Sequence, residues 1–187
     1  MHSTVSTGSV TTMGHELLPV IGSEQIRKRV RELGREISHA YANIDQPLVT
    51  VCVLKGAVVF FADLIRCMSI DPVIDFVRVA SYGQGTSRQD QILLSKDLEV
   101  DIAGREVLIV EDIVDTAHSV RLLKDHLQQR KPSGISTCAL VDKHERREVD
   151  VQVDFCGFRL EKGFIVGYGM DYAEQFRHLD GIFELKI

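Results

Sequence analysis

The chain has 187 residues, of which 44% are hydrophobic and 26% are charged, so it can form one domain with a true core but hardly two. Its formal net charge of −5 argues against a general nucleic-acid binder, which usually carries a basic excess on one face. No apolar run approaches the ~18 residues that a membrane helix needs. We therefore expect a globular protein with neither a nucleic-acid nor a membrane partner.

The N-terminal segment is polar, rich in Ser and Thr, and lacks the apolar core of a signal peptide. We expect residues 1–14 to be a disordered tail and residues 15–187 to form a single domain.

The four cysteines form no C-x-x-C pair, and each lies in an apolar stretch: Cys52, Cys67, Cys138 and Cys156. We interpret them as buried reduced thiols rather than as disulfides. Reduced thiols are typical of reducing compartments, which predicts a cytoplasmic protein.

The predicted elements alternate between helices and strands. Apolar residues recur at three- and four-residue steps from Gly22 to Tyr41, which predicts an amphipathic helix capped by Ser23. The continuous apolar run 48–54 is typical of a strand in a parallel sheet covered on both faces. Further strands are expected at 73–80, 106–110, 135–142, 151–156, 163–168 and 182–186, and further helices at 57–68 and 119–131.

This alternation predicts an α/β domain with a mainly parallel sheet flanked by helices. Ligands of such sheets bind outside the carboxyl ends of the strands, so functional residues should follow the strands. The polar segment 81–96 is long for a connection in a compact domain, which is typical of a functional lid or a disordered segment.

The most informative segment is VLIVEDIVDTAHS (107–119), in which a buried strand leads into a group of carboxylates. The adjacent Glu111 and Asp112 can each accept a hydrogen bond from a vicinal diol such as that of ribose. Small and hydroxylated residues then open a helix, whose free N–H groups favour a phosphate. The pattern suits a ribose 5-phosphate. The alternative is a solvated acidic helix start, with Asp115 or Thr116 as its cap.

Five separated segments resemble the motifs of type I phosphoribosyltransferases. The segment 107–119 resembles their phosphoribosyl-diphosphate signature, and its Glu-Asp start is similar to the 6-oxopurine branch, as in bacterial hypoxanthine phosphoribosyltransferases. The other four resemble the first pyrophosphate loop (51–66), the mobile lid (81–86), the purine-recognition segment (139–147) and the hood region (163–179).

The resemblance implies the type I phosphoribosyltransferase fold, with a small hood built from the chain ends. It implies an Mg2+-dependent enzyme of purine salvage that joins hypoxanthine to the phosphoribosyl group of 5-phosphoribosyl 1-diphosphate, with guanine as an open alternative. The expected partners are these two small molecules and further copies of the chain, in a homotetramer or homodimer.

The resemblance also assigns roles to the acidic segment. Asp115 is the catalytic residue, a general base or electrostatic partner beside N7 of the purine. Glu111 and Asp112 hold the ribose hydroxyls, and both join Asp171 as candidate magnesium residues. The residues implied in binding the 5-phosphate are Thr116, Ala117, His118 and Ser119.

By the same resemblance, Lys55, Gly56 and Arg177 bind the pyrophosphate, and a cis peptide joins Lys55 to Gly56. Ser81 and Tyr82 belong to the lid, in which Tyr82 closes over the reacting centre and keeps water out.

Three residues are implied in reading the purine. Lys143 donates to the exocyclic 6-oxygen, Phe164 stacks on the ring, and Ile165 supplies backbone hydrogen bonds. An ammonium group cannot accept a hydrogen bond from the 6-amino group of adenine, which excludes that base. Standing alone, Lys143 would be an ordinary surface lysine, like Arg146 and Arg147, and Phe164 a core residue.

The phosphate loop departs from the family pattern, because Ala117 stands where the family has glycine and Ser119 where threonine is common. If φ of Ala117 is negative, the loop can still surround the phosphate with a slightly poorer approach. His118 either compensates with a charge-assisted hydrogen bond to the phosphate or points to solvent, and both interpretations stay open.

Two other functions remain open. One is a non-catalytic regulator on the same fold that binds pyrimidine-operon RNA, although such proteins need a basic surface and this chain is acidic. The other is a phosphoribosyltransferase for another base, such as xanthine or a pyrimidine.

Overall fold

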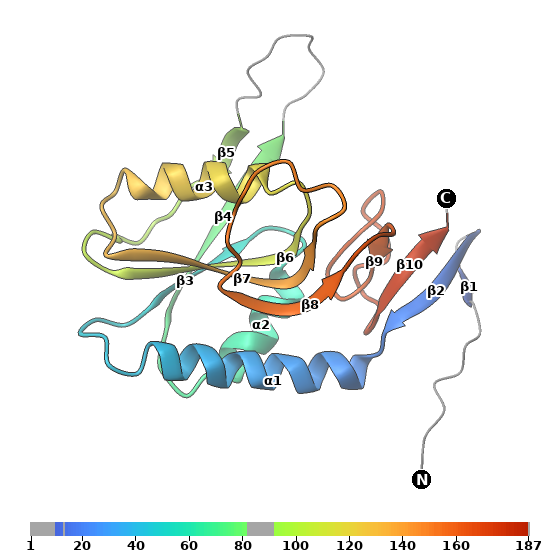
Figure 1. Ribbon diagram of the computed structural model, residues 1–187, viewed down its shortest axis with the longest axis horizontal. Helices are drawn as coiled ribbons and strands as arrows, with labels where there is room; N and C mark the ends of the chain where they lie inside the picture. Colours follow the sequence, from blue (N-terminus) through green and yellow to red (C-terminus); the bar gives the residue numbers. More distant parts are fainter. Residues whose placement is uncertain (1–9, 13, 82–91, 187) are drawn as a thin grey trace.

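The computed structural model describes residues 10–12, 14–81 and 92–186, which form two sheets with helices packed around the larger one (Figure 1). The larger sheet has the strand order β5-β4-β3-β6-β7-β8. Its strands are β3 (Val49–Val53), β4 (Val73–Ser81), β5 (Ile92–Lys96), β6 (Glu106–Val114), β7 (Gly134–Lys143) and β8 (Phe155–Leu160). Strands β4, β3, β6, β7 and β8 pair in parallel, and β5 pairs antiparallel with β4. The predicted α/β domain with a mainly parallel sheet is confirmed.

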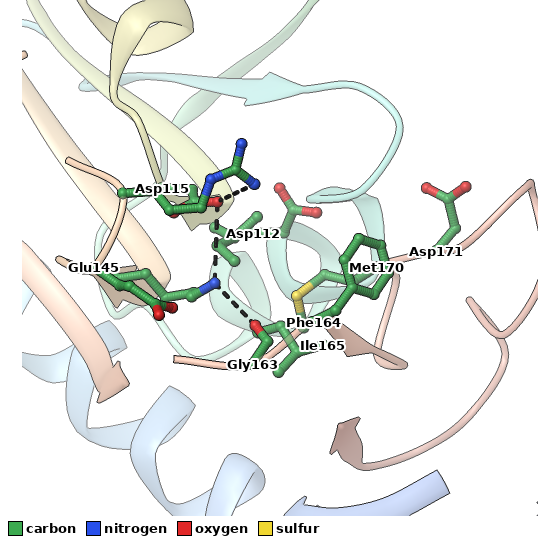
Figure 2. A pocket seen from close by; sticks show the side chains of 11 residues that line it. Asp112, Asp115, Glu145, Gly163, Phe164, Ile165, Met170 and Asp171 are labelled. Carbon is green, nitrogen blue, oxygen red and sulfur yellow. Dashed lines mark hydrogen bonds and ion pairs between the residues drawn. The ribbon is translucent and has the colours of Figure 1, made fainter. Parts of the chain in front are cut away.

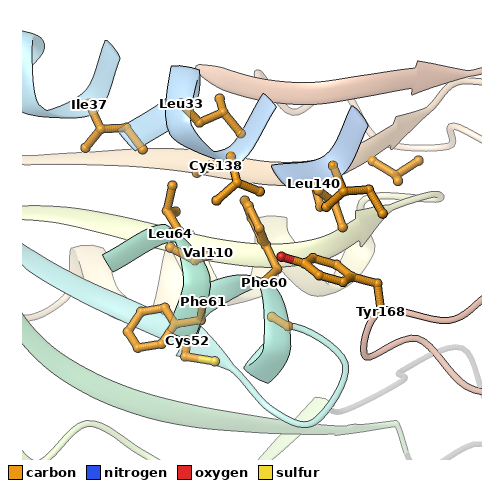
Figure 3. Close-up of a cluster of buried hydrophobic side chains, with 14 of the residues drawn as sticks. Leu33, Ile37, Cys52, Phe60, Phe61, Leu64, Val110, Cys138, Leu140 and Tyr168 are labelled. Atoms are coloured by element: carbon orange, nitrogen blue, oxygen red, sulfur yellow. The ribbon is translucent and has the colours of Figure 1, made fainter. Parts of the chain in front are cut away.

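Helices cover both faces of this sheet. α1 (Ser23–Ala40) and α2 (Val58–Arg66) lie on one face, and α3 (His118–Gln128) lies on the other (Figure 1). The core cluster under α1 and α2 contains fully buried side chains of both helices, such as Leu33 and Phe60 (Figure 3).

Consecutive side chains of β6 point alternately to the two faces of the sheet and pack in different core clusters. Leu108 and Val110 belong to the cluster under α1 and α2, whereas Val107 and Ile109 pack in the cluster that includes Leu123 of α3. Side chains alternate between the faces of a strand, so a strand covered on both sides must be apolar at every position.

The second sheet has the order β1-β2-β10-β9, and we call it the hood. Its strands are β1 (Val10–Thr12), β2 (His15–Ile21), β9 (Ile165–Val166) and β10 (Ile182–Lys186), and all of their pairs are antiparallel. Leu17, Val166, Phe176 and Leu185 form a core cluster of this region. The hood therefore joins segments from the two ends of the chain (Figure 1).

Two predicted boundaries were wrong. Gly22, not Ser23, caps α1, and its N–H donates to Gln25 Oε1 at 3.0 Å, so the side chain of Ser23 is not needed there. β6 runs on to Val114 through the predicted acidic loop, because its pairing with β7 continues as far as Val114 opposite Asp142.

Other elements also differ from expectation. β8 begins at Phe155 rather than at 151, and β9 is shorter than the predicted strand 163–168. β2 was not predicted, β5 lies within the expected connection 81–96, and β1 lies within the segment expected to be a tail. Ser81 ends β4, whereas Tyr82 and the rest of the lid, like residues 1–9 and 13, lie outside the described residues.

All four cysteines are free thiols, of which Cys52 and Cys138 are buried and Cys67 and Cys156 are partly exposed. Among the described residues, no helix has the length and apolar character that crossing a membrane requires.

Candidate active site

A cavity of about 480 Å³ opens where β6 and β7 end, next to the hood (Figure 2). Its lining contains six residues that the sequence predicted for the site: Asp112, Asp115, Lys143, Phe164, Ile165 and Asp171. Five further lining residues were not predicted: Ile113, Glu145, Arg146, Gly163 and Met170. All five lie within the motif segments 107–119, 139–147 and 163–179. Including every residue of these segments as a candidate would have identified them from the sequence.

Lys143 is the last residue of β7, and only 5% of its surface is exposed. Its Nζ donates to the Gly163 carbonyl at 2.9 Å and lies 3.9 Å from Asp115 Oδ2 (Figure 2). The interpretation as an ordinary surface lysine is therefore wrong. Since an ammonium group has three donors, Lys143 keeps donor capacity for a ligand in the cavity.

Asp115 follows the end of β6, and its Oδ2 also lies 3.6 Å from Arg146 Nη1. Its Oδ1 is buried and has no hydrogen-bond partner. A buried oxygen without a partner costs free energy that a donor on a ligand would recover. Ala117 caps α3 without a side-chain hydrogen bond, so the alternative of Asp115 or Thr116 as the cap is wrong.

Phe164 and Ile165 enter the cavity from the hood. Phe164 is 44% exposed, and its ring meets Tyr172 edge to face with centroids 5.6 Å apart, so it is not a core residue. Ile165 is buried in β9, where it pairs with Glu184 of β10. An exposed aromatic face on a fixed strand can stack against a planar ligand.

The loop between β6 and α3 encloses a second cavity, of about 250 Å³, lined by residues 111–117, 119 and 120. Ala117 has φ 70° and ψ 5°, in the left-handed region. The negative φ considered for Ala117 from the sequence does not occur in the structure. The left-handed conformation turns the chain into α3. The first N–H groups of a helix have no acceptor within it, so those of α3 are available to a ligand at this loop. Thr116 and Ser119 also line this cavity, as expected for residues that bind a phosphate.

His118 pairs with a carboxylate, whereas the sequence suggested only the phosphate or solvent as its surroundings. Its Nε2 lies 2.8 Å from Glu148 Oε2, both side chains are more than half exposed, and it does not line the cavity of the loop. Neither interpretation of His118 included this exposed pair.

Glu111 and Asp112 are consecutive residues of β6 in a poorly solvated environment. Burial, followed by the charge of Asp112, raises the pKa of Glu111 well above its usual range. Burial, and to a smaller extent the charge of Asp171, raises the pKa of Asp112 to about 6. Both residues line the smaller cavity, and Asp112 also lines the larger one, so the pair connects the two cavities.

Gly56 lies between two close neighbours. A Cβ on Gly56 would meet Asp112 Oδ2 at 1.8 Å, and a Cβ on Gly169 would meet the Gly56 carbonyl at 2.2 Å. The cis peptide joins Leu54 to Lys55, one bond earlier than the predicted one between Lys55 and Gly56. The local sequence contains no proline to mark it, so sequence patterns give little warning of such a bond.

The predicted pyrophosphate residues Lys55 and Arg177 share one carboxylate. Glu174 accepts hydrogen bonds from Lys55 Nζ at 2.8 Å and from Arg177 Nη2 at 3.2 Å. Arg177 also pairs with Asp171 at 2.6 Å and donates to the Gly169 carbonyl at 2.8 Å. Its Nε is buried without a partner, which leaves one donor for an anion. Glu174 was missed in the sequence, because nothing local distinguishes it from an ordinary surface glutamate.

The carboxylates of Asp112 and Asp171 are the candidate metal ligands of the larger cavity. Within residues 10–12, 14–81 and 92–186, no group of three or more His, Cys, Asp or Glu side chains could enclose a metal. Mg2+ is commonly held by one or two carboxylates together with substrate phosphates and water. Burial, and less strongly the charge of Asp171, raises the pKa of Asp112, and a bound cation would stabilise both carboxylates in their charged form, so the donor set fits magnesium.

Arg147 is not the ordinary surface arginine that the sequence predicts. Its side chain is 15% exposed and forms an ion pair with the buried Asp142. Arg146 is 66% exposed, as expected, but it reaches back to Asp115.

Comparison with known proteins gives one consistent answer. The family model described as "Phosphoribosyl transferase domain" matches residues 22–173. A hypoxanthine-guanine phosphoribosyltransferase of Aquifex aeolicus is 41% identical over 173 residues, which are 92% of this chain and 97% of that protein. A hypoxanthine phosphoribosyltransferase of Escherichia coli is 41% identical over 167 residues, 89% of this chain and 94% of that protein.

Solved structures agree with the sequence comparison. A crystal structure of a hypoxanthine-guanine phosphoribosyltransferase from Bacillus anthracis superposes with a TM-score of 0.83 at 41% identity, covering 89% of this chain and 96% of that one. A hypoxanthine phosphoribosyltransferase from Staphylococcus aureus superposes with a TM-score of 0.84 at 36% identity, covering 90% of each chain. The chain therefore has the type I phosphoribosyltransferase fold and belongs to the phosphoribosyltransferase family of transferases.

Proposed function

We propose that this enzyme transfers the phosphoribosyl group of 5-phosphoribosyl 1-diphosphate to N9 of hypoxanthine, giving IMP and pyrophosphate in purine salvage. The observation that carries the proposal is the pair formed by Lys143 and Asp115, an ammonium and a carboxylate 3.9 Å apart on one cavity wall. A 6-oxopurine presents O6 and N7 side by side on one edge, so such a pair can contact both positions.

The purine site is proposed from three side chains. Lys143 donates to O6, Asp115 accepts from a protonated N7, and the exposed face of Phe164 stacks on the ring. The buried Asp115 Oδ1 without a partner supports this orientation, because the N7 proton would satisfy it. Ile165 supplies backbone groups to the edge of the base from β9.

The ribose 5-phosphate site is proposed along the loop before α3. Glu111 and Asp112 accept from the ribose hydroxyls, and the phosphate lies in the smaller cavity against the helix start. The N–H groups of that loop and the side chains of Thr116 and Ser119 supply donors, and the helix dipole favours the anion.

The pyrophosphate site is proposed at Lys55, Gly56 and Arg177. Asp171, with Asp112 and Glu111, would hold Mg2+, which neutralises the charge on the leaving pyrophosphate when it is bound. The residues of the chain orient that group: Arg177 offers its buried Nε, and Gly56 permits close approach of the backbone.

In the proposed reaction, the lone pair of N9 forms the bond to C1′ as the bond from C1′ to the pyrophosphate oxygen breaks. The electron pair of the broken bond leaves with pyrophosphate, and the proton on N7 passes to Asp115. The carboxylate of Asp115 also stabilises the positive charge that develops in the transition state.

A panel of bases tests this function. The protein is mixed with 5-phosphoribosyl 1-diphosphate, Mg2+ and one base at a time, and pyrophosphate release is followed. We expect release with hypoxanthine and little with adenine; the guanine and xanthine rates define the range of 6-oxopurines. Asp115→Asn should lower kcat by ~10²-fold at an unchanged melting temperature.

Other outcomes would support the alternatives. Release only with xanthine or a pyrimidine would indicate a transferase for another base. No release with any base, together with tight binding of RNA, would indicate a regulator.

We further propose a cytoplasmic location and a homo-oligomeric state. The free thiols support a reducing compartment, and burial raises the pKa of Cys52 to about 12, which keeps it unreactive. Sedimentation analysis at micromolar concentration would separate a homodimer from a homotetramer.

A further inference from the structure

Arg147 connects the two strand ends that carry Asp115 and Lys143. Its Nε donates to the Asp115 carbonyl at 3.0 Å, and its Nη2 donates to the Val114 carbonyl at 3.2 Å. The same Nη2 donates to the Lys143 carbonyl at 3.0 Å, and Nη1 donates to the Val151 carbonyl at 3.3 Å. One side chain thus bonds the main chain at the end of β6, at the end of β7 and in the segment that follows.

The guanidinium is itself held in place. It forms an ion pair with Asp142, whose side chain is 6% exposed and also lies 3.0 Å from His144 Nε2. A largely buried cation with this many acceptors has a fixed geometry, and the planar fork of arginine matches several acceptors at once in a way that lysine does not.

Arg147 does not line the cavity, although Lys143, Glu145 and Arg146 from the same segment do. Any effect on a ligand must therefore act through the residues that Arg147 holds. Asp115 and Lys143 both line the cavity, and they lie on the two main-chain segments that Arg147 joins.

We propose that Arg147 is a positioning residue for purine recognition, which fixes the distance between the groups that read N7 and O6. The inference rests on the function proposed above. N7 and O6 have a fixed spacing in the rigid purine, so the ammonium and the carboxylate need a matching spacing. A displacement of about 1 Å is enough to cost up to ~10²-fold in such a site.

Two ligands separate recognition of the 6-position from the contacts to ribose and phosphate. IMP and purine ribonucleoside 5′-monophosphate share the ribose, the phosphate and N7, but the second lacks the 6-oxygen and the hydrogen on N1. Their dissociation constants, measured by calorimetry, give a ratio that reports recognition of O6 together with N1–H. For the unsubstituted chain we expect IMP to bind at least about tenfold more tightly, the usual range for a hydrogen bond to a charged group.

The main variant is Arg147→Lys, which keeps the charge but loses the fork. We expect it to reduce this ratio by about fivefold or more. The KM for 5-phosphoribosyl 1-diphosphate should change less than this ratio does, because Arg147 bonds the main chain only at the start of the loop before α3, at Val114 and Asp115, and bonds none of the proposed pyrophosphate residues. Arg121→Lys, at an exposed position on α3, is the matched control and should leave the ratio unchanged.

A double-mutant cycle tests whether the effect passes through Lys143. Lys143→Ala removes the donor to O6 and should lower the ratio to the part that N1–H contributes. Adding Arg147→Lys to that variant should then change the ratio no further. Asp142→Asn keeps an oxygen acceptor for Arg147 but loses the charge, and it should give a smaller reduction than Arg147→Lys. It also provides the measurement if Arg147→Lys does not fold.

The outcomes distinguish the inference from the function on which it rests. If the unsubstituted chain binds both nucleotides equally, the proposed reading of the 6-oxygen is wrong. If the unsubstituted chain discriminates, and the Arg147 or Asp142 variant lowers only the melting temperature while the ratio stays the same, Arg147 has a purely structural role and the inference is overturned.

Discussion

The carboxylate of Asp112 lies directly against Gly56, so that a Cβ on Gly56 would be 1.8 Å from Asp112 Oδ2. Residues 56 and 112 come from the segments after β3 and within β6, two neighbouring parallel strands. The proposed pyrophosphate loop therefore touches the proposed ribose site through Gly56 and Asp112.

The first prediction follows from this contact. Gly56→Ala should displace Asp112 and raise the KM for 5-phosphoribosyl 1-diphosphate by ~10-fold or more, since a shift of about 1 Å has large effects in a preorganised site. Steady-state kinetics with varied 5-phosphoribosyl 1-diphosphate would measure it. Gly104→Ala is the control: Gly104 has φ 66° and open space around it, so this change should reduce stability but leave KM unaltered.

The second prediction concerns the left-handed Ala117. Replacing it by glycine removes a backbone strain of about 1–2 kcal/mol. Glycine also increases the entropy of the unfolded chain and removes a methyl group that is buried in the cluster with Val114 and Val120, and these two costs offset the gain. Ala117→Gly should therefore leave stability about equal, leave kcat nearly unchanged and lower the KM for 5-phosphoribosyl 1-diphosphate. Ala103→Gly, at an exposed position without a positive φ, should instead destabilise by about 0.4–1 kcal/mol. A clear loss of stability in both variants would contradict the assigned backbone conformation.

The third prediction concerns Glu174, whose carboxylate bridges Lys55 and Arg177. In the proposed pyrophosphate site, pyrophosphate oxygens would replace this carboxylate on both cations. Glu174→Gln should therefore strengthen product inhibition by pyrophosphate about two- to fivefold, the scale of exposed ion pairs. Glu161→Gln, at another exposed glutamate, should have no such effect. Weaker inhibition by pyrophosphate in Glu174→Gln would show that the carboxylate supports the site rather than competes for it.

The fourth prediction is a pH dependence of stability without Mg2+ and substrates. Burial, and less strongly the charge of Asp171, raises the pKa of Asp112 from 3.8 to about 6, so the folded state binds more protons than the unfolded state between these values. Its contribution to the free energy of unfolding should then increase as the pH falls from about 6 to about 4. Denaturant unfolding at several pH values would measure it. Asp112→Asn should be more stable than the unsubstituted chain at pH 7.5, and the gain should shrink towards pH 4.

The sequence by itself determined the α/β class, the main strands and the motifs that form the site. These are local properties: an apolar run such as that of β6 can be buried only in a covered sheet, and Glu111 and Asp112 stand together in the chain whatever the fold. Parallel strands also bring their carboxyl ends to one edge, which is why residues after β6 and β7 line one cavity.

Only the tertiary structure decided the contacts between distant segments. Arg146 and Arg147 look alike in the sequence, yet Arg146 is exposed, whereas Arg147 is largely buried at the ends of two strands and forms an ion pair with Asp142. Glu174 meets Lys55 across 119 positions of the chain, and no local pattern records such a pairing. The left-handed φ of Ala117 is likewise imposed by the packing around it, because an alanine alone prefers a negative φ. Burial, ion pairing and backbone strain depend on which distant segments come into contact. These contacts exist only in the folded chain, so local sequence patterns do not reveal them.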